Sequence, residues 1–190
     1  QFLAKAMLKL ILIRHAESLA NANSITQGQK IDEPLSELGK IQAKKLALRL
    51  KGEQIDMIFS SDLKRALHTA EEISKVLHKK IILDTRLREK DHDHEGKEEL
   101  IIRCKSFLED MKKHKGTVLV VAHGGPNMTL LAISTGSREK GAQIYTQTKQ
   151  HNACINILSW LGDRWHIERM NDVSHLKPSE ITIQEKRKKT

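Results

Sequence analysis

The sequence predicts an α/β domain built as a three-layer α/β/α sandwich with a mainly parallel central sheet. Short, mostly apolar runs such as 8–13 and 117–122 are typical of parallel strands buried on both faces. These runs alternate with longer stretches whose apolar residues recur at helical spacing. Strands that alternate with helices indicate a layered α/β domain. A chain of 190 residues is long enough to bury the core of one such domain.

The elements follow one another in a regular order. We expect a strand at 8–13, a polar loop over 16–34, a helix through residue 50, a strand at 57–59, a helix over 63–77, a strand at 81–83, a charged loop over 86–97, a helix over about 97–113, a strand at 117–122, a further helix, and late strands at 153–160 and 164–170 joined by a tight turn at Gly162-Asp163. Ser36 is the expected cap of the first helix, and Gly52 its end. Ser61 or Asp62 is expected to cap the second, and Pro126 suits the first position of the helix after 117–122.

The ends of the chain differ in composition from the predicted domain, which we assign to residues 7–176. Residues 1–6 read poorly as the start of a domain, and we expect them to be a leader foreign to the native protein. Residues 177–190 form a basic tail, which contributes to the net charge of +9. Such a charge attracts nucleic acid or small phosphorylated molecules, although a solvated surface is its ordinary explanation. Aromatic residues make up only 3% of the chain, which argues against base stacking, so we expect no nucleic-acid partner.

Two further observations bear on the environment of the protein. No apolar run approaches the ~20 residues needed to span a bilayer, so we expect no membrane association. Cys104 and Cys154 are far apart in sequence and lack metal-type spacing. We expect both to be free, buried thiols in the cytoplasm, where disulfides are rare.

Several chemically capable residues stand where the predicted strands end. They are Arg14-His15, Ser60-Ser61 with Arg65 in the next helical turn, Glu89, and His123-Gly124-Gly125. Ligands of open α/β sheets bind beyond the carboxyl ends of the strands, so these residues should meet at one edge. Any one of them alone would be ordinary scaffolding. Together, two histidines, two arginines, a carboxyl group and the amides that open a helix predict an anion-binding catalytic site.

The motifs resemble those of the histidine phosphatase superfamily, also called phosphoglycerate mutase-like, from about Leu8 to Leu176. The matching segments are Arg14-His15-Ala16-Glu17-Ser18, Gln27-Gly28 with Asp32, Pro34-Leu35-Ser36-Glu37-Leu38-Gly39, Phe59 to Ala66 with Thr69-Ala70-Glu71, Leu87-Arg88-Glu89, Val121-Ala122-His123-Gly124-Gly125, and Asn171-Asp172 with His175-Leu176. The resemblance implies a phosphoglycerate mutase-like fold, an enzyme that transfers phosphoryl groups, and His15 as the residue that is phosphorylated.

Charge and geometry suggest how such a site would work. A phosphoryl group in transfer spreads negative charge over its oxygens, so positioned donors do most of the work. Arg14 and Arg65 can supply forked donors, His123 a third, and the amide of Gly124 or Gly125 another. Asn21 and Ser61 are expected secondary phosphate contacts, although a loop-stabilising role suits Asn21 nearly as well. Since side chains supply the positive charge, we expect neither a metal ion nor another cofactor.

The general acid is less clearly defined than the nucleophile. The resemblance implies Glu89, and Asp91 is the rival. The loop from 89 to 96 also holds His92 and His94 between acidic residues, where the family often has glycine and an aromatic residue. A metal site is one interpretation of these histidines, and solvated surface is the other.

The chain also departs from the family pattern by a deletion. After Gly96-Lys97, where the family commonly inserts a two-helix lid, the sequence passes almost directly into the helix that contains Cys104. The predicted domain therefore has a reduced lid and an open site, which favours transfer of the phosphoryl group to water.

We therefore expect a metal-independent phosphatase that hydrolyses phosphate monoesters of small molecules through phosphorylated His15. Alternatives are a cofactor-dependent phosphoglycerate mutase and a phosphohistidine protein phosphatase acting on a phosphoprotein. A non-catalytic phosphate- or RNA-binding protein is the contrasting class. The natural substrate and the oligomeric state are left open by the sequence.

Overall fold

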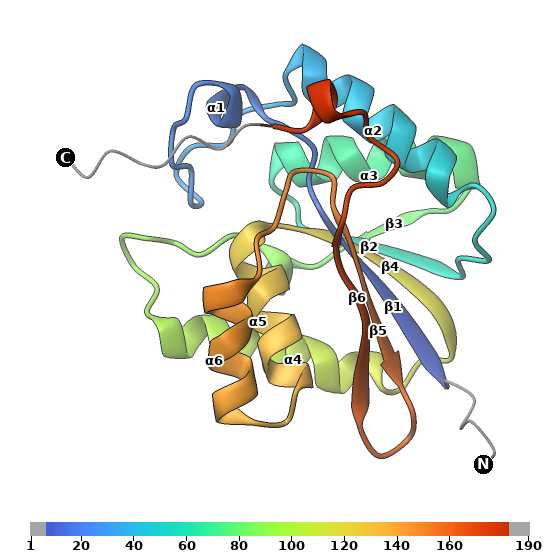
Figure 1. Ribbon diagram of the computed structural model, residues 1–190, viewed down its shortest axis with the longest axis vertical. Coiled ribbons are helices and arrows are strands. Elements are labelled where there is room, and N and C mark those ends of the chain that lie inside the picture. The colour runs from blue at the N-terminus through green and yellow to red at the C-terminus, as the bar shows by residue number, and fades with distance from the viewer. Residues whose placement is uncertain (1–6, 183–190) are drawn as a thin grey trace.

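A six-stranded sheet in the order β3-β2-β4-β1-β5-β6 runs through the middle of the computed structural model, which describes residues 7–182 (Figure 1). The strands are β1 (Leu8–Arg14), β2 (Met57–Ser60), β3 (Ile81–Leu83), β4 (Gly116–Ala122), β5 (Ile155–Trp160) and β6 (Trp165–Asp172). β1, β2, β3 and β4 are mutually parallel, and β5 and β6 add an antiparallel edge. The predicted fold class is therefore confirmed.

Helices cover both faces of the sheet. They are α1 (Leu19–Ala22), α2 (Glu37–Leu50), α3 (Lys64–Leu77), α4 (Lys97–Met111), α5 (Gly124–Ser134) and α6 (Arg138–Gln147), with short 3-10 turns at Thr85–Leu87 and Pro178–Glu180. In Figure 1, α2 and α3 lie on one side of the sheet, and α4, α5 and α6 lie on the other. This arrangement gives the three layers that the sequence predicts.

Strand β1 shows why the sheet is buried on both faces. Ile11 and Ile13 join the core under α2 and α3, whereas Leu10 and Leu12 join the core under α4 and α5. All four side chains are at most 1% exposed. Full burial of such a side chain stabilises the fold by ~1.5–3 kcal/mol, so β1 anchors both layers.

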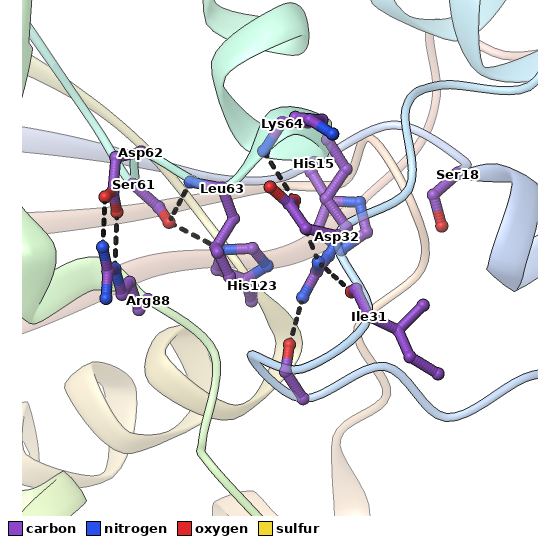
Figure 2. A network of polar contacts seen from close by, with 12 residues as sticks. His15, Ser18, Ile31, Asp32, Ser61, Asp62, Leu63, Lys64, Arg88 and His123 are labelled. Carbon is purple, nitrogen blue, oxygen red and sulfur yellow. Dashed lines mark hydrogen bonds and ion pairs between the residues drawn. The ribbon is translucent and has the colours of Figure 1, made fainter.

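The predicted helix boundaries are confirmed in one case and wrong in two. Ser36 caps α2, where its Oγ accepts from Gly39 N at 2.9 Å. Ser61 and Asp62 do not cap α3, which begins at Lys64 with Leu63 in the cap position and no side-chain cap bond from it. Instead, Asp32 from the long loop accepts from Lys64 N at 2.7 Å, as Figure 2 shows. Its negative charge suits the positive end of the helix.

The second correction concerns α5. This helix begins at Gly124, so Pro126 occupies its third position rather than the first. Proline still costs no helical hydrogen bond at this position, because the amides of the first turn have no partner within the helix.

Two helices were absent from the sequence prediction. α1 is a single turn inside the predicted polar loop, and α6 follows α5 across a short connection. The expected turn at Gly162-Asp163 is present, with Gly162 at φ +99° and Leu161 N donating to Arg164 O at 3.0 Å.

The chain remains packed beyond Leu176. Gln42 of α2 donates through Nε2 to Glu180 O at 2.8 Å and to Thr182 Oγ1 at 3.0 Å. The first part of the predicted basic tail therefore lies against α2. The remainder, residues 183–190, and the predicted leader 1–6 lie outside the described residues. Within 7–182, no helix is both long and apolar enough to cross a bilayer.

Candidate active site

The registers of three neighbouring strands bring the predicted site residues into one row. Arg14 of β1 pairs with Ala122 of β4, and Ser60 of β2 pairs with Val121. The next residues along these strands are His15, His123 and Ser61, and all three are at most 2% exposed. The rings of the two histidines have centroids 5.0 Å apart. The carboxyl edge of the sheet thus holds the predicted cluster.

His15 is oriented by its own backbone. Its Nδ1 lies 2.7 Å from Ala16 O, and a carbonyl oxygen can only accept, so Nδ1 carries the proton. In the neutral ring, Nε2 then holds the lone pair. Burial, together with the charges of Arg65 and Arg14, holds the pKa of His15 well below its usual 6.5. The imidazole is therefore neutral at pH 7 and has the protonation state of a nucleophile.

His123 is held by a serine from the neighbouring strand. Its Nε2 lies 2.9 Å from Ser61 Oγ, and Ser61 Oγ also accepts from Leu63 N at 3.3 Å (Figure 2). Burial is the largest influence that holds the pKa of His123 well below 6.5, and the positive charges of Arg65 and Arg14 add to it. The Ser61 hydroxyl is therefore engaged with the Leu63 amide and with the His123 ring.

The two arginines approach from different elements. Arg65 is 1% exposed, and its Nη2 donates to Gly28 O at 2.8 Å and its Nη1 to Ile31 O at 3.2 Å. Burial lowers the pKa of Arg65 to about 10, so the guanidinium stays charged at pH 7. Arg14 Nη1 donates to Gln150 O. Both guanidinium charges act on His15, which places a cationic environment around its ring.

Two buried nitrogen atoms of this cluster have no hydrogen-bond partner among the described residues: Arg65 Nε and His123 Nδ1. Buried polar atoms are nearly always satisfied, and a guanidinium nitrogen can only donate. An oxyanion in front of His15 would satisfy such a donor. The donor set of the cluster therefore fits a phosphoryl group.

Glu89 faces the first turn of α5. Its Oε2 accepts from Gly125 N at 3.3 Å, and its Oε1 accepts from Lys90 N at 2.8 Å. The position of a Cβ on Gly124 would lie 4.0 Å from Glu89 Oε2 and 3.7 Å from Arg14 Nε, so the carboxylate and Arg14 flank the same glycine. The structure thus brings Glu89 to the edge that holds the histidines.

Asp91, the rival acid, is turned toward its own loop. Its carboxylate accepts from Asp93 N at 3.0 Å and from His94 N at 3.3 Å. The hydrogen bond from Asp93 N is the largest influence that lowers the pKa of Asp91, with smaller contributions from His94. Asp91 is therefore held by the amides of its own loop, whereas Glu89 lies against Gly124 and Gly125 beside Arg14.

Asn21 is engaged in local structure. It closes a capping box on α1, where its Oδ1 accepts from Ser18 N at 3.2 Å. The same oxygen accepts from Asn152 Nδ2 at 3.1 Å. These bonds are those of a loop-stabilising residue, the alternative role that the sequence left open.

Two residues that support the site were missed from the sequence. Thr69 Oγ1 accepts from Ala16 N at 3.0 Å and donates to Arg65 O at 2.7 Å, so it joins the loop after His15 to α3. Asn152 Nδ2 donates to His15 O at 3.1 Å. Thr69 belongs to a quoted motif, but no local signal indicates its partner. Asn152 lies 137 positions from His15, and only the fold brings them together.

Two loops border the polar cluster, where the deletion led us to expect an open site. α4 begins at Lys97, directly after Gly96, so no lid helices intervene. However, the segment 28–32 lies over Arg65 and contacts the acid loop, where Gln29 Nε2 donates to Glu89 O at 2.9 Å. Lys30 also pairs with Asp93 across 3.7 Å at the surface. The cluster of His15, Arg65 and His123 is therefore buried, and two loops rather than two helices border it.

The histidines of the acid loop lie at the surface. His92 and His94 are exposed, and His94 Nδ1 lies 3.3 Å from Asp91 Oδ2. Within residues 7–182, no group of three His, Cys, Asp or Glu side chains is arranged to hold a metal ion.

Comparison with known proteins agrees with this fold. The model of the histidine phosphatase superfamily, branch 1, matches residues 10–98 and 90–173. The chain belongs to this superfamily, and it is an enzyme of the phosphatase and phosphoglycerate mutase-like type.

Some of the relatives are named phosphatases and others phosphoglycerate mutases. The chain is 31% identical to the putative phosphoserine phosphatase 2 of Hydrogenobacter thermophilus, with 90% of this chain and 98% of that protein covered. It is also 31% identical to the probable phosphoglycerate mutase GpmB of Photorhabdus laumondii, with 90% and 95% covered. Its fold matches a mycobacterial glucosyl-3-phosphoglycerate phosphatase solved with VO3, at a TM-score of 0.76, 27% identity, and coverage of 86% and 98%.

Proposed function

We propose that the protein is a metal-independent phosphatase that hydrolyses phosphate monoesters of small metabolites through a phosphohistidine on His15. The observation that carries the proposal is the state of His15: Nδ1 donates to Ala16 O, and burial keeps the ring neutral. Nε2 is thus left as a nucleophile beside two guanidinium groups. The phosphatases among the relatives support the reaction class.

In the first step, His15 Nε2 attacks phosphorus in line and the bond from phosphorus to the ester oxygen breaks. Arg14, Arg65 and His123 stabilise the charge that spreads over the phosphoryl oxygens. The departing alkoxide takes a proton from Glu89. In the second step, Glu89 takes a proton from water, the water oxygen attacks phosphorus, and phosphate leaves neutral His15 behind.

Hydrolysis is preferred over mutase chemistry because of the entrance. No helical lid separates the site from solvent, since α4 follows Gly96 directly. A mutase must hold its substrate and exclude water while the phosphoryl group returns to it, and no lid helices follow Gly96 to close over this site. An anionic substrate suits the positive charges of Arg14 and Arg65 beside His15.

The test combines turnover with trapping of the intermediate. A panel of phosphorylated metabolites, including phosphoserine and 3-phosphoglycerate, is assayed for phosphate release and for formation of 2-phosphoglycerate, and alkaline-quenched enzyme is mapped for phosphohistidine by mass spectrometry. We expect phosphate release and label on His15, both absent in His15→Ala and unchanged in the exposed-histidine control His94→Ala. Unchanged turnover in His15→Ala contradicts the mechanism, and dominant 2-phosphoglycerate formation favours the mutase.

We also propose that the protein works in the cytoplasm. Cys104 and Cys154 are both free and buried, and burial raises the pKa of their thiols to about 12 and about 11. Unreactive, unpaired thiols suit a reducing compartment. Fractionation of the source cells tests this location, and recovery of the protein outside the cytoplasm would refute it.

A further inference from the structure

A buried pair of side-chain amides lies behind Arg14, outside the proposed catalytic set. Gln150 is 7% exposed and Asn156 is fully buried. The two amides bond reciprocally: Gln150 Nε2 donates to Asn156 Oδ1 at 2.8 Å, and Asn156 Nδ2 donates to Gln150 Oε1 at 2.9 Å. Each side chain therefore uses its donor and its acceptor on the other, which fixes both in one orientation.

The pair is anchored to the sheet. Asn156 Nδ2 donates to Leu12 O at 3.2 Å, two residues before Arg14 on β1, and Asn171 N donates to Asn156 Oδ1 at 2.9 Å. Cys154 Sγ adds a contact of 3.3 Å to Gln150 Oε1. Because burial raises the pKa of Cys154 to about 11, this thiol keeps its proton and acts as a donor.

Arg14 depends on this pair through one backbone carbonyl. Its Nη1 donates to Gln150 O. That carbonyl lies in the irregular connection between the end of α6 at Gln147 and the start of β5 at Ile155, so no helix or strand fixes it. The peptide unit that bears this carbonyl is restrained from two sides: the Gln150 side chain is clamped by Asn156, and His151 N donates to Asn171 Oδ1 at 2.7 Å.

We propose that Gln150 and Asn156 are positioning residues that hold the guanidinium of Arg14 toward the phosphoryl group. The proposal rests on the proposed function of Arg14 as a phosphoryl ligand. Breaking a fully satisfied buried amide pair leaves polar atoms unpaired, so the clamp is rigid as long as both members are present. Displacement of a positioning group by about 1 Å can cost roughly a hundredfold in rate.

The test is a double-mutant cycle between Asn156→Leu and Arg14→Ala. For each variant, kcat and KM for p-nitrophenyl phosphate and the affinity for orthovanadate are measured. We expect Asn156→Leu to lower kcat/KM roughly 10- to 100-fold in the native background, mostly through kcat. In the Arg14→Ala background it should change kcat/KM by less than about twofold, because its effect passes through Arg14. Vanadate affinity should follow the same pattern.

Equal losses in both backgrounds would show a merely structural pair, and no loss in the native background would show that Arg14 does not need it; either result overturns the proposal. Gln150→Met, which retains the backbone carbonyl, repeats the cycle in case Asn156→Leu does not fold. Ser159→Ala is the matched control: it removes a part-buried hydrogen bond to Glu168 at the far end of β5, where Ser159 pairs with Lys9. Loss of activity in His15→Ala is measured in parallel, so that failure of the catalytic proposal is distinguished from failure of this one.

Discussion

Glu89 and Gly125 are packed so closely that a Cβ at position 125 would displace the Glu89 carboxylate. A Cβ added to Gly125 would lie 2.3 Å from Glu89 Oε1, a distance that such atoms do not reach without movement. The other carboxylate oxygen of this side chain, Glu89 Oε2, accepts a hydrogen bond from Gly125 N. The amide of Gly125, in the first turn of α5, therefore fixes the position of the proposed general acid.

We expect Gly125→Ala to lower kcat for an alkyl phosphate roughly tenfold while the protein stays folded, because the flexible end of Glu89 gives way and loses its aim. Alanine also favours the helix by ~1 kcal/mol over glycine, so the melting temperature should not fall. Gly124→Ala is the comparison, since its added Cβ meets Arg14 Nε at an ordinary 3.7 Å. A larger loss in Gly124→Ala than in Gly125→Ala would contradict this account.

The choice between Glu89 and Asp91 can be made with two isosteric variants. Glu89→Gln should lower kcat about 10²- to 10⁴-fold for an alkyl phosphate, whose leaving group needs a proton, and much less for p-nitrophenyl phosphate, whose leaving group does not. Asp91→Asn should have little effect on either substrate, because Asp91 is bound by the amides of its own loop. Steady-state kinetics with both substrates measure this, and the reverse pattern would assign the acid to Asp91.

Acid should destabilise the fold through the buried histidines. The pKa values of His15 and His123 are held well below 6.5 in the folded protein, mainly by burial, whereas the unfolded chain titrates near 6.5. Above that value both states are neutral and these groups do not affect stability. Below it the unfolded state binds more protons, so stability falls until the pH passes the folded pKa values. The melting temperature should therefore drop between about pH 7 and about pH 5. His15→Gln should flatten the drop and the exposed His94→Gln should not; equal slopes in all three proteins would refute the assignment.

Gly39 is predicted to be essential for stability. A Cβ at this position in α2 would lie 1.9 Å from Glu17 O, and backbone cannot move aside as a flexible side chain can. We expect Gly39→Ala to destabilise the protein by about 1–3 kcal/mol or more in a urea titration. Gly52→Ala is the matched control, because nothing lies within 4 Å of its added Cβ. If both variants unfold at the same urea concentration, the contact is not decisive.

Removal of divalent metal ions should leave turnover intact. Arg14 and Arg65 provide the positive charge beside His15, as their influence on its pKa indicates. Phosphate release in excess chelator should equal release in untreated enzyme. Loss of activity that a divalent ion restores would show that the reaction needs a metal.

Much of the fold could be predicted from local patterns of apolar and polar residues along the chain. The buried runs around Ile11 and Val120 and the helical periodicity of α2 to α4 specify strands and helices locally, so the layers followed. α6 could not be predicted in this way. Its large apolar side chains are only those of Ile144 and Tyr145, and it is held by its packing on α5 rather than by a strong pattern of its own.

The sequence by itself determined which residues stand at the strand ends, His15, Arg14 and His123 among them, and the family to which the chain belongs. The tertiary structure alone decided their partners: Asp32 rather than Asp62 at the start of α3, and the carbonyl of Gln150 on Arg14. The physical reason is distance along the chain. Arg14 and Gln150 are 136 positions apart, and a hydrogen bond between such residues exists only once the sheet has placed β5 beside β1.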